Sequence, residues 1–555
     1  MKKGFFKRCP KSNNIVGINT RSVWYRLFFP VMGLLSLAWF LLRVIPKPSR
    51  ISYPCQRAAL PMAVAFLSFI GGAKGAAKIC RIIKSRPPAR AALKSIGSVA
   101  AMCLVIYFVF PVLFLGCRDT TPNLPVATLP HTEPPPSPTA DEAAEAGLYN
   151  LPVTREIRTR EDIFEFYRVP ARGVGIHPGR VVVMRNPAAV RFDGSGYWWQ
   201  DEHTVPEEVS SMFAQSMLAL TGQLNIAGAW DALFRYFNGG APYRPGEKIA
   251  IKLNMNQDRR GRTPNLHLPA PQLIAALVSD LVHVVGAAPE DITLTDPSRP
   301  IGDATYYYFR NHPDPALRRV RFVAQNRIPP EADRTQPLHF ADGQIGYVPT
   351  DFTAAAYLIN FALFRPHDHY GITFIAKNHY GSVQFGAGNS FSPVSMHSSW
   401  NNGYGEYSHL TDLLAFYHLG GKTILNIIDG LYSAYHQSDG NVRRMYSFGG
   451  YEFPALLFLS QDPVAIDSVA YDFLKIELEL NSRFIARMPG RAFDNYLIEA
   501  AFLDRPPSNT DYDPNRTGVR VSLGAFETWN NPVDRQYSRN LGRDFGIELI
   551  QIGFD

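Results

Sequence analysis

The sequence predicts a mostly parallel α/β domain that follows N-terminal transmembrane helices. Two observations predict the α/β domain: short runs rich in β-branched residues recur through the second half of the chain, and longer runs with helical periodicity lie between them. Such alternation is typical of a mostly parallel sheet flanked by helices. A third observation, long apolar runs bordered by basic residues near the N-terminus, predicts the membrane segment.

The predicted elements follow one another through the second half of the chain. Strands are expected at residues 248–255, 291–296, 319–325, 355–364, 371–377, 422–429 and 455–462. Helices are expected at residues 271–286, 409–420 and 463–479. Residues 150–245 are rich in aromatic and turn residues, so we interpret them as a mixed lobe, and residues 512–555 as a C-terminal extended appendage.

The basic character of the chain is confined to its N-terminal part. Residues 1–117 contain 18 Lys or Arg and no Asp or Glu, whereas the rest of the chain carries 38 basic and 48 acidic side chains. The positive charges border apolar runs, which is the pattern of membrane proteins and not of nucleic-acid-binding surfaces. We therefore expect the lipid bilayer as a partner, and no nucleic acid.

Three mainly apolar runs, near residues 27–45, 58–73 and 95–117, are predicted transmembrane helices. The third is long enough to cross a bilayer, for which about 20 residues are needed. Basic residues number seven before the first run, four from Arg43 to the start of the second run, and seven between the second and third. The positive-inside rule then predicts a bacterial inner-membrane protein with its soluble domain on the extracytoplasmic side. If the second run only dips into the membrane, the domain is cytoplasmic instead.

The soluble part is predicted to be separated from the membrane and free of cysteine chemistry. Residues 118–147 hold seven prolines and read as a stiff, extended linker before a soluble α/β domain at residues 148–511. All five cysteines lie in residues 1–117. The soluble domain therefore has no Cys-ligated iron–sulfur cluster, no Cys-type zinc site and no structural disulfide.

Carboxylates stand at the carboxyl ends of three predicted strands. Asp296, Asp429 and Asp462 each end such a run, and open α/β sheets bind ligands at this edge. Together they suggest a divalent-metal or substrate site. Structural roles remain open, because Asp462 precedes Pro463 and a helical run, as an N-cap does, and Asp429 precedes a glycine, as in a turn.

Histidines concentrate in the same part of the chain. Seven of the fourteen fall within residues 367–436. In an extended segment, His367 and His369 point to one face, about 7 Å apart along the backbone, which allows one metal ion to accept both. Exposed loop histidines are the alternative interpretation.

Lysine and asparagine are paired twice near predicted strand ends. Lys252 and Asn254 close one strand, and Lys377 and Asn378 close another within the segment KNHYG. A lysine there holds an anion or transfers a proton if its pKa is lowered, and the amide orients a carbonyl or phosphate oxygen. Lysines that simply extend into solvent are the alternative.

These segments, in this order, resemble the domain-of-unknown-function 362 family. The resemblance rests on IKLNM (251–255), His367 with the later KNHYG, IIDGL (427–431) and DPVAID (462–467), and it covers about residues 248–473. It implies an α/β domain and marks six residues as its site. They are His367, Lys377, Asn378, Asp429, Asp462 and Asp467.

Two departures limit what the resemblance implies. Leu253 stands where the family usually has proline, and the chain lacks the ferredoxin-like cysteines of some relatives. An electron-transfer role taken from those relatives would therefore lack its cofactor. The family has no established reaction.

The leading hypothesis is a membrane-anchored extracytoplasmic enzyme that acts on a small anionic or envelope substrate. His367, His369, Asp429 and Asp462 would ligate a divalent metal ion, either an oxygen-loving ion or zinc, iron or manganese. Lys377 and Lys252 would act as catalytic groups on an anionic substrate, and Asn254, Asn378, Asp296 and Asp467 would contact the substrate. Two alternatives are a non-catalytic binding module for an envelope ligand, such as a glycan or peptide, and a scaffold of a membrane redox complex.

Overall fold

The structure is a computed structural model that describes most of the chain from residue 171 onward. The described residues are 6–8, 15–18, 171–255, 265–367, 371–386, 391, 403–437, 439–448, 450–481 and 492–554. Near the N-terminus, strands β1 (Phe6–Arg8) and β2 (Ile15–Ile18) pair antiparallel. Every other described element lies within the compact unit Pro130–Asp555.

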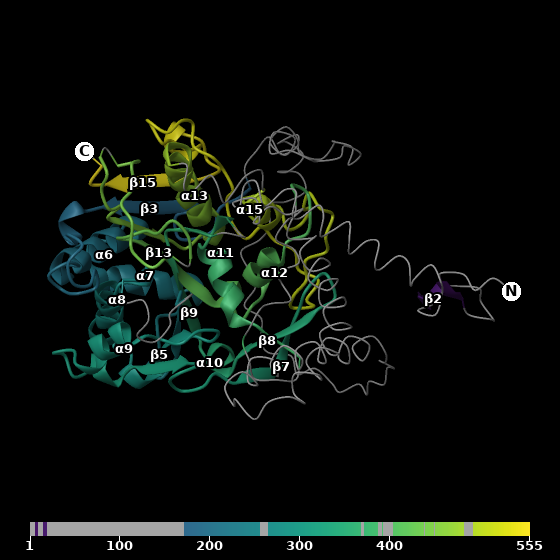
Figure 1. Ribbon diagram of the computed structural model, residues 1–555, viewed down its shortest axis with the longest axis horizontal. Helices are drawn as coiled ribbons and strands as arrows, with labels where there is room; N and C mark the ends of the chain where they lie inside the picture. The colour runs from purple at the N-terminus through teal and green to yellow at the C-terminus, as the bar shows by residue number, and fades with distance from the viewer. Residues whose placement is uncertain are drawn as a thin grey trace, which may run out of the picture. The chain divides into compact units, whose positions relative to one another are not determined.

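An eight-stranded, mostly parallel sheet forms the centre of this unit (Figure 1). In spatial order its strands are β15 (Glu548–Ile552), β3 (Arg180–Arg185), β14 (Leu456–Ser460), β13 (Thr423–Gly430), β9 (Tyr357–Leu363), β4 (Ile249–Leu253), β5 (Ile292–Asp296) and β6 (Arg321–Ala324). The strands from β13 to β6 run parallel, whereas β14 runs antiparallel to both of its neighbours. The predicted α/β fold with a mostly parallel sheet is confirmed.

Helices cover both faces of the sheet (Figure 1). One face packs against α6 (Pro206–Thr221), α7 (Ile226–Phe237), α8 (Pro271–His283) and α9 (Asp303–Arg310). The other packs against α10 (Thr350–Thr353), α11 (Ile375–Asn378), α12 (His409–Ala415), α13 (Pro463–Leu480) and α15 (Asn495–Ala501). Because both faces are buried, the central strands are nearly continuous apolar runs.

The alternation of side chains along β4 directs Lys252 to the face of the sheet that α11 covers. Ile249, Ile251 and Leu253 belong to the core on the α8 side, and Ala250 belongs to the core on the α11 side. Strand side chains alternate, so Lys252 also faces the α11 side. A charged side chain is thus directed into the core under α11, where it needs partners.

Two smaller pairings complete the described elements. Strands β7 (Ala332–His339), β8 (Ile345–Pro349) and β12 (Gln384–Phe385) form a three-stranded antiparallel sheet in the order β12-β8-β7. Strands β10 (Pro366–His367) and β11 (Gly371–Ile372) form a short antiparallel pair.

One predicted strand is wrong over most of its length. The run 371–377 was expected to be a single strand, but only Gly371–Ile372 is extended, and Ile375–Asn378 forms the short helix α11. The side chain of Asp467 accepts hydrogen bonds from the backbone N–H groups of Ile375 and Ala376. This cap satisfies the first amides of the turn and favours a helix over a strand.

The predicted mixed lobe (150–245) and the predicted C-terminal extended appendage (512–555) both contribute strands to the sheet. Within residues 150–245, the described part supplies β3 and helices α6 and α7. The C-terminal segment supplies β15, which pairs in parallel with β3, and it buries Tyr537 and Ile547 in the core. Both segments are therefore part of the fold that holds the central strands.

The predicted transmembrane runs and the linker lie outside the described residues. Across the part of the chain that the structure describes, no helix combines the length and the apolar character needed to cross a membrane.

Candidate functional site

The parallel strands end at one edge of the sheet, which we call the carboxyl edge. Asp296 is the last residue of β5, and Lys252 is the penultimate residue of β4. Arg365 follows the end of β9 by two residues, and Asp429 is the penultimate residue of β13. Parallel pairing brings these four positions to the same edge, where open α/β sheets bind ligands.

Lys252 is buried at this edge, with 1% of its surface exposed. Its Nζ donates to the Leu253 carbonyl at 2.6 Å and to Asn378 Oδ1 at 3.1 Å, and it lies 3.4 Å from Asp296 Oδ2. Burial lowers the pKa of Lys252, and the Asp296 carboxylate opposes this effect. All three contacts are internal, so Lys252 joins β4, β5 and α11.

Asp296 supports the backbone that surrounds Lys252. Its Oδ2 accepts from the backbone N–H of Met255 at 2.8 Å, and its Oδ1 accepts from the N–H and hydroxyl of Ser298 at 3.2 and 3.1 Å. Both carboxylate oxygens are therefore occupied by the protein. This predicted substrate contact holds the loops after β4 and β5 in place.

Asn378 attaches α11 to the sheet. Its amide donates to the Lys252 carbonyl at 3.1 Å, to the Phe361 carbonyl at 3.1 Å and to Asn360 Oδ1 at 2.7 Å. Asn360 lies 2.9 Å from Nε2 of His379. Burial lowers the pKa of His379 to about 3, which keeps its ring neutral. The lysine–asparagine–histidine sequence is thus anchored on β4 and β9.

Asp467, on α13, positions α11 from the other side. Its carboxylate accepts from the N–H groups of Ile375 and Ala376 at 2.8 and 3.1 Å, and from the Tyr496 hydroxyl at 2.8 Å. Burial raises the pKa of Asp467 to about 7, although these hydrogen bonds oppose the rise. Asp467 therefore holds the backbone of α11, the helix that carries Lys377, in place.

Lys377 is the charged group of α11 that retains partial exposure to solvent. Burial, together with the positive charges of Arg299, Lys252 and Arg365, lowers its pKa to about 7, and the charge of Asp296 opposes this effect. Its Nζ lies 4.2 Å from the centre of the Tyr380 ring. At neutral pH, this amine is therefore divided between its charged and neutral forms.

Arg299 and Arg365 complete what we call the cation cluster, defined as Lys252, Arg299, Arg365 and Lys377. Arg365 is fully buried; it donates to the His267 carbonyl at 2.6 Å and lies 3.5 Å from Asn254 Oδ1. Burial lowers the pKa of Arg365 to about 9. Sequence analysis missed both arginines. Their signal was the same as for the lysines, a basic residue just after a strand.

Two histidines adjoin the cation cluster. The His267 ring is buried, and neither of its nitrogens has a hydrogen-bond partner among the described residues. Burial and the charge of Arg365 hold its pKa well below the usual range, so the ring is neutral. His367 is also buried, on β10 next to Arg365, and His369 lies outside the described residues.

Asp429 was predicted to be a metal ligand. In the structure its carboxylate accepts hydrogen bonds from backbone N–H groups. Its Oδ2 accepts from the N–H of Ala270 at 2.8 Å and its Oδ1 from the N–H of Leu431 at 3.0 Å. Burial raises the pKa of Asp429 to about 6. The carboxylate thereby holds the start of α8 against the end of β13.

Asp462 lies at the opposite edge of the sheet, which corrects the prediction that it shares the edge with Asp296 and Asp429. The strand before it, β14, runs antiparallel to β13, and Asn426 pairs with Ser460 while Asp429 pairs with Leu457. Asp462 therefore lies about five strand residues, or roughly 17 Å, from the level of Asp429. One metal ion cannot be bound by both side chains.

The carboxylate of Asp462 is fully used by the backbone. It accepts from the N–H groups of Val464 and Ala465 at 3.0 and 2.8 Å, and from those of Val174 and Ala525 at 3.0 Å each. Burial raises its pKa to about 6. This is the N-cap role that sequence analysis left open, extended to two distant loops. Across the described ranges, no group of three His, Cys, Asp or Glu side chains is placed to hold a metal ion.

The glycine of KNHYG is required by close packing. A Cβ atom on Gly381 would lie 2.5 Å from Ser298 Oγ and 3.2 Å from Asp296 Oδ1. The turn after α11 therefore approaches the loop after β5 more closely than a larger residue allows.

Comparison with known proteins identifies the region but not a reaction. Residues 249–472 match the model of the family described as Domain of unknown function (DUF362). The match spans Lys252, Asp296, Arg365, Lys377 and Asp467. No curated protein matches the chain.

Proposed function

Because residues 249–472 form a domain of the domain-of-unknown-function 362 family, whose name assigns no reaction, we propose a function from the geometry of the carboxyl edge. The edge binds a small anionic substrate, and Lys377 is the group that acts on it. The observation that carries this proposal is the excess of positive charge. Among the described residues four cations gather there, and Asp296, the carboxylate that lies near Lys252, is already bonded on both oxygens.

Buried charges of one sign are unfavourable unless something compensates them. Asp296 offsets Lys252, but Lys377 has three cations around it, and these lower its pKa in the absence of a ligand. A bound anion would reverse that effect and restore the charge on Lys377. The site therefore gains more from an anion than from a neutral ligand.

An amine with a pKa of about 7 suits acid–base chemistry at neutral pH. In its charged form Lys377 holds the anion, and in its neutral form it accepts a proton from the substrate. Lys252 is the second lysine of the hypothesis. Its contacts to Leu253, Asn378 and Asp296 support a positioning role, not direct contact with the substrate.

The test is anion binding by the purified full-length protein in mild detergent. Sulfate is the probe, because its charge is constant between pH 5 and 9, and titration calorimetry measures its affinity. We expect Lys377→Met to weaken sulfate binding at least about tenfold, the loss of roughly one charge-assisted contact. Lys248→Met is the matched control, since Lys248 is exposed and precedes β4 at the far edge.

Equal sulfate affinity in the wild type and Lys377→Met would contradict the proposal. Binding that depends on Lys377 without turnover of any phosphate or carboxylate substrate would favour the non-catalytic binding module instead. The first outcome tests whether Lys377 is part of an anion site, and the second tests whether that site is catalytic.

We also propose that a divalent metal ion binds at this edge, with His367 and His369 as its protein ligands. Two imidazoles suit zinc, iron or manganese when other ligands come from substrate or water. Plasma mass spectrometry of the full-length protein, purified without chelator or histidine tag, measures the metal content. Near-stoichiometric metal that is lost in His367→Ala supports a metal site, and equal content in both proteins contradicts it.

We further propose that residues 1–117 anchor the chain in the inner membrane, with the domain on the extracytoplasmic side. The support is the sequence alone: three apolar runs bordered by 18 basic residues. Protease treatment of spheroplasts tests the orientation. Cleavage of the domain from outside supports it, and protection until the membrane is lysed contradicts it.

A further inference from the structure

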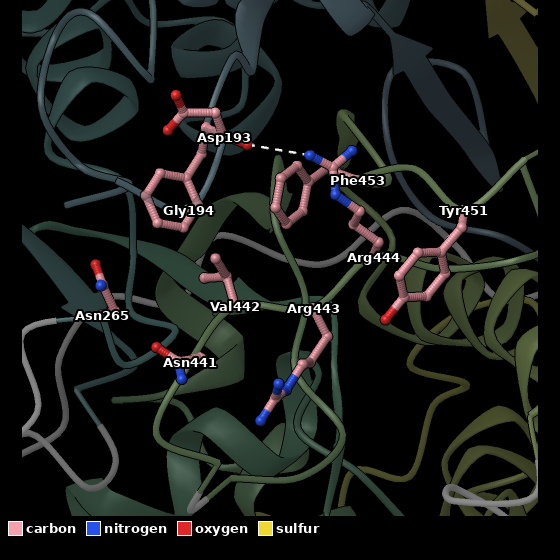
Figure 2. A pocket seen from close by; sticks show the side chains of 10 residues that line it. Asp193, Gly194, Asn265, Asn441, Val442, Arg443, Arg444, Tyr451 and Phe453 are labelled. Atoms are coloured by element: carbon pink, nitrogen blue, oxygen red, sulfur yellow. Dashed lines mark hydrogen bonds between the residues drawn. The ribbon is translucent and has the colours of Figure 1, made fainter. Parts of the chain in front are cut away.

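A groove separate from the lysines opens on the surface of the α/β domain (Figure 2). It has a volume of about 290 Å³ and lies between the loop of Asp193 and the loop of Asn441 and Tyr451. Figure 2 shows the labelled side chains arranged around it. We call it the tyrosine groove. None of its side chains belongs to the cation cluster.

The two arginines of the groove are already engaged. Arg443 makes a two-point ion pair with Asp439, at 2.8 Å from Nε and 2.7 Å from Nη2. Arg444 lies 4.5 Å from the centre of the Phe453 ring and donates to the Phe192 carbonyl at 3.2 Å. The groove therefore offers little unpaired positive charge, and a bare anion has less to bind here than at the cation cluster.

What remains accessible is the exposed carboxylate of Asp193 together with neutral polar groups and aromatic faces. Asn441 is exposed, and 48% of the Tyr451 surface is exposed. The ring of Tyr446, also half exposed, lies 4.8 Å from that of Tyr451 and continues the aromatic surface. Amide and phenol groups bond to hydroxyls, and aromatic faces pack on the C–H face of a sugar ring.

The size of the groove agrees with one sugar ring. Its volume of about 290 Å³ lies at the lower limit of ligand pockets, which run from roughly 300 to 1,000 Å³. An extended ligand would fill it with one unit and continue elsewhere. The exposed Tyr446, beside Tyr451, extends the aromatic surface in one direction.

Two links connect the groove to the cation cluster. Asp439, the partner of Arg443, also acts electrostatically on Arg365, whose pKa it raises against the effect of burial. Asn265 lines the groove, and His267, two residues later, accepts from Arg365. Asn265 of the groove and His267, which contacts the cation cluster, therefore lie on one loop.

We propose that the tyrosine groove binds a sugar ring of an anionic saccharide whose acidic group is held by the cation cluster. The part that concerns the acidic group rests on the proposed function. The groove itself rests on the geometry around Tyr451. The acidic group of such a ligand is either a carboxylate or a phosphate. The cation cluster would recognise both by the same interaction, the attraction between its positive charges and an anion.

The experiment measures the affinity of the full-length protein for four probes by titration calorimetry. The probes are sulfate, trigalacturonate, glucose 1-phosphate and the neutral maltotriose. We expect trigalacturonate or glucose 1-phosphate to bind at least about tenfold more tightly than sulfate or maltotriose, since both subsites then contribute. The stronger of the two identifies the acidic group.

Variants separate the two subsites. Tyr451→Ala should weaken the anionic saccharide about tenfold but leave sulfate unchanged, because the aromatic face is lost. Tyr451→Phe keeps that face and should stay within about twofold of the wild type. Tyr307→Ala is the matched control, since Tyr307 is 50% exposed on α9.

Each contrary result has one meaning. If sulfate binds through Lys377 but no saccharide gains affinity and Tyr451→Ala has no effect, the groove proposal is overturned and the proposed function stands. If no probe depends on Lys377, the proposed function fails. If saccharides bind through Tyr451 without regard to their acidic group, the link to the cation cluster is overturned.

Discussion

The two edges of the sheet hold buried charges of different kinds. At the opposite edge, Asp462 is surrounded by four backbone N–H groups that use both of its oxygens. At the carboxyl edge, Lys377 is partly exposed and has three cations near it. A buried charge whose bonding capacity is taken up by the backbone stabilises the fold. A charge that lies among like charges, as Lys377 does, has its pKa lowered by them.

Asp467 belongs with Asp462 in this comparison, although it lies under α11. It caps the helix that carries Lys377, so it connects the structural carboxylates to the cation cluster. Four experiments test the division between structural and functional charges.

The largest expected effect is at Asp462. Asp462→Ala leaves four N–H groups, three of them buried, without their acceptor, which should lower the free energy of unfolding by at least about 3 kcal/mol. Urea unfolding of the full-length protein measures this loss. Asp231→Ala, in an exposed ion pair on α7, is the control and should change stability by less than about 1 kcal/mol. A small effect at Asp462 would contradict its structural role.

The next effect is the pH dependence contributed by Asp467. Its pKa is raised to about 7 in the folded state from the usual 3.8, so its contribution to stability is present at low pH and is lost as the pH rises through 7. Asp467→Asn does not titrate. From pH 5 to pH 8 the wild type should therefore lose on the order of 2–4 kcal/mol relative to the variant. Urea unfolding at both values tests this, and a constant difference would be contrary evidence.

The third effect is the pH dependence of sulfate binding. The pKa of Lys377 is about 7, so the free site loses its charge as the pH rises above 7. Affinity should then fall by up to about tenfold per pH unit, because binding must restore one proton. Calorimetry at pH 6, 7 and 8 measures the slope. The slope should be absent from Lys377→Met, and its persistence there would assign the titration to another group.

The smallest effect is at Gly381. Gly381→Ala places a Cβ atom 2.5 Å from Ser298 Oγ, which should cost about 1–3 kcal/mol of stability and displace the turn after α11. Sulfate affinity should drop a few-fold, in proportion to a small shift of Lys377. Ser298→Ala removes the contacting hydroxyl and should restore much of the stability in the double variant. If the double variant is no more stable than Gly381→Ala, the close approach of Ser298 is not the reason that residue 381 must be glycine.

Much of the sheet was predictable from local sequence. The runs that became β4, β5, β9, β13 and β14 are apolar and β-branched, and burial on both faces requires that composition. The run at 371–377 had the same local pattern and was predicted wrongly. Its outcome depends on Asp467, which lies 91 residues away from Ala376 in the chain, so no local pattern contains the cap.

The candidate site was predictable in part, for a related reason. Lys252, Asp296 and Lys377 stand at ends of predicted elements, and the structure brings them together at one edge. Asp462 also ends a strand, but strand direction decides which edge it occupies. Arg299 and Arg365 carried the same strand-end signal and were overlooked.

The sequence by itself determined the fold class, the absence of cysteine after residue 117, the match of residues 249–472 to the model of the domain-of-unknown-function 362 family and the chemical types of the candidate site residues. Those properties follow from composition and short-range order. Only the tertiary structure decided that β14 runs antiparallel, that Asp462 and Asp467 serve the backbone, and that four cations share one edge. These outcomes depend on which distant segments pair and pack. The same type of side chain at a strand end serves the backbone where N–H groups surround it, and only the packing of distant segments decides where that happens.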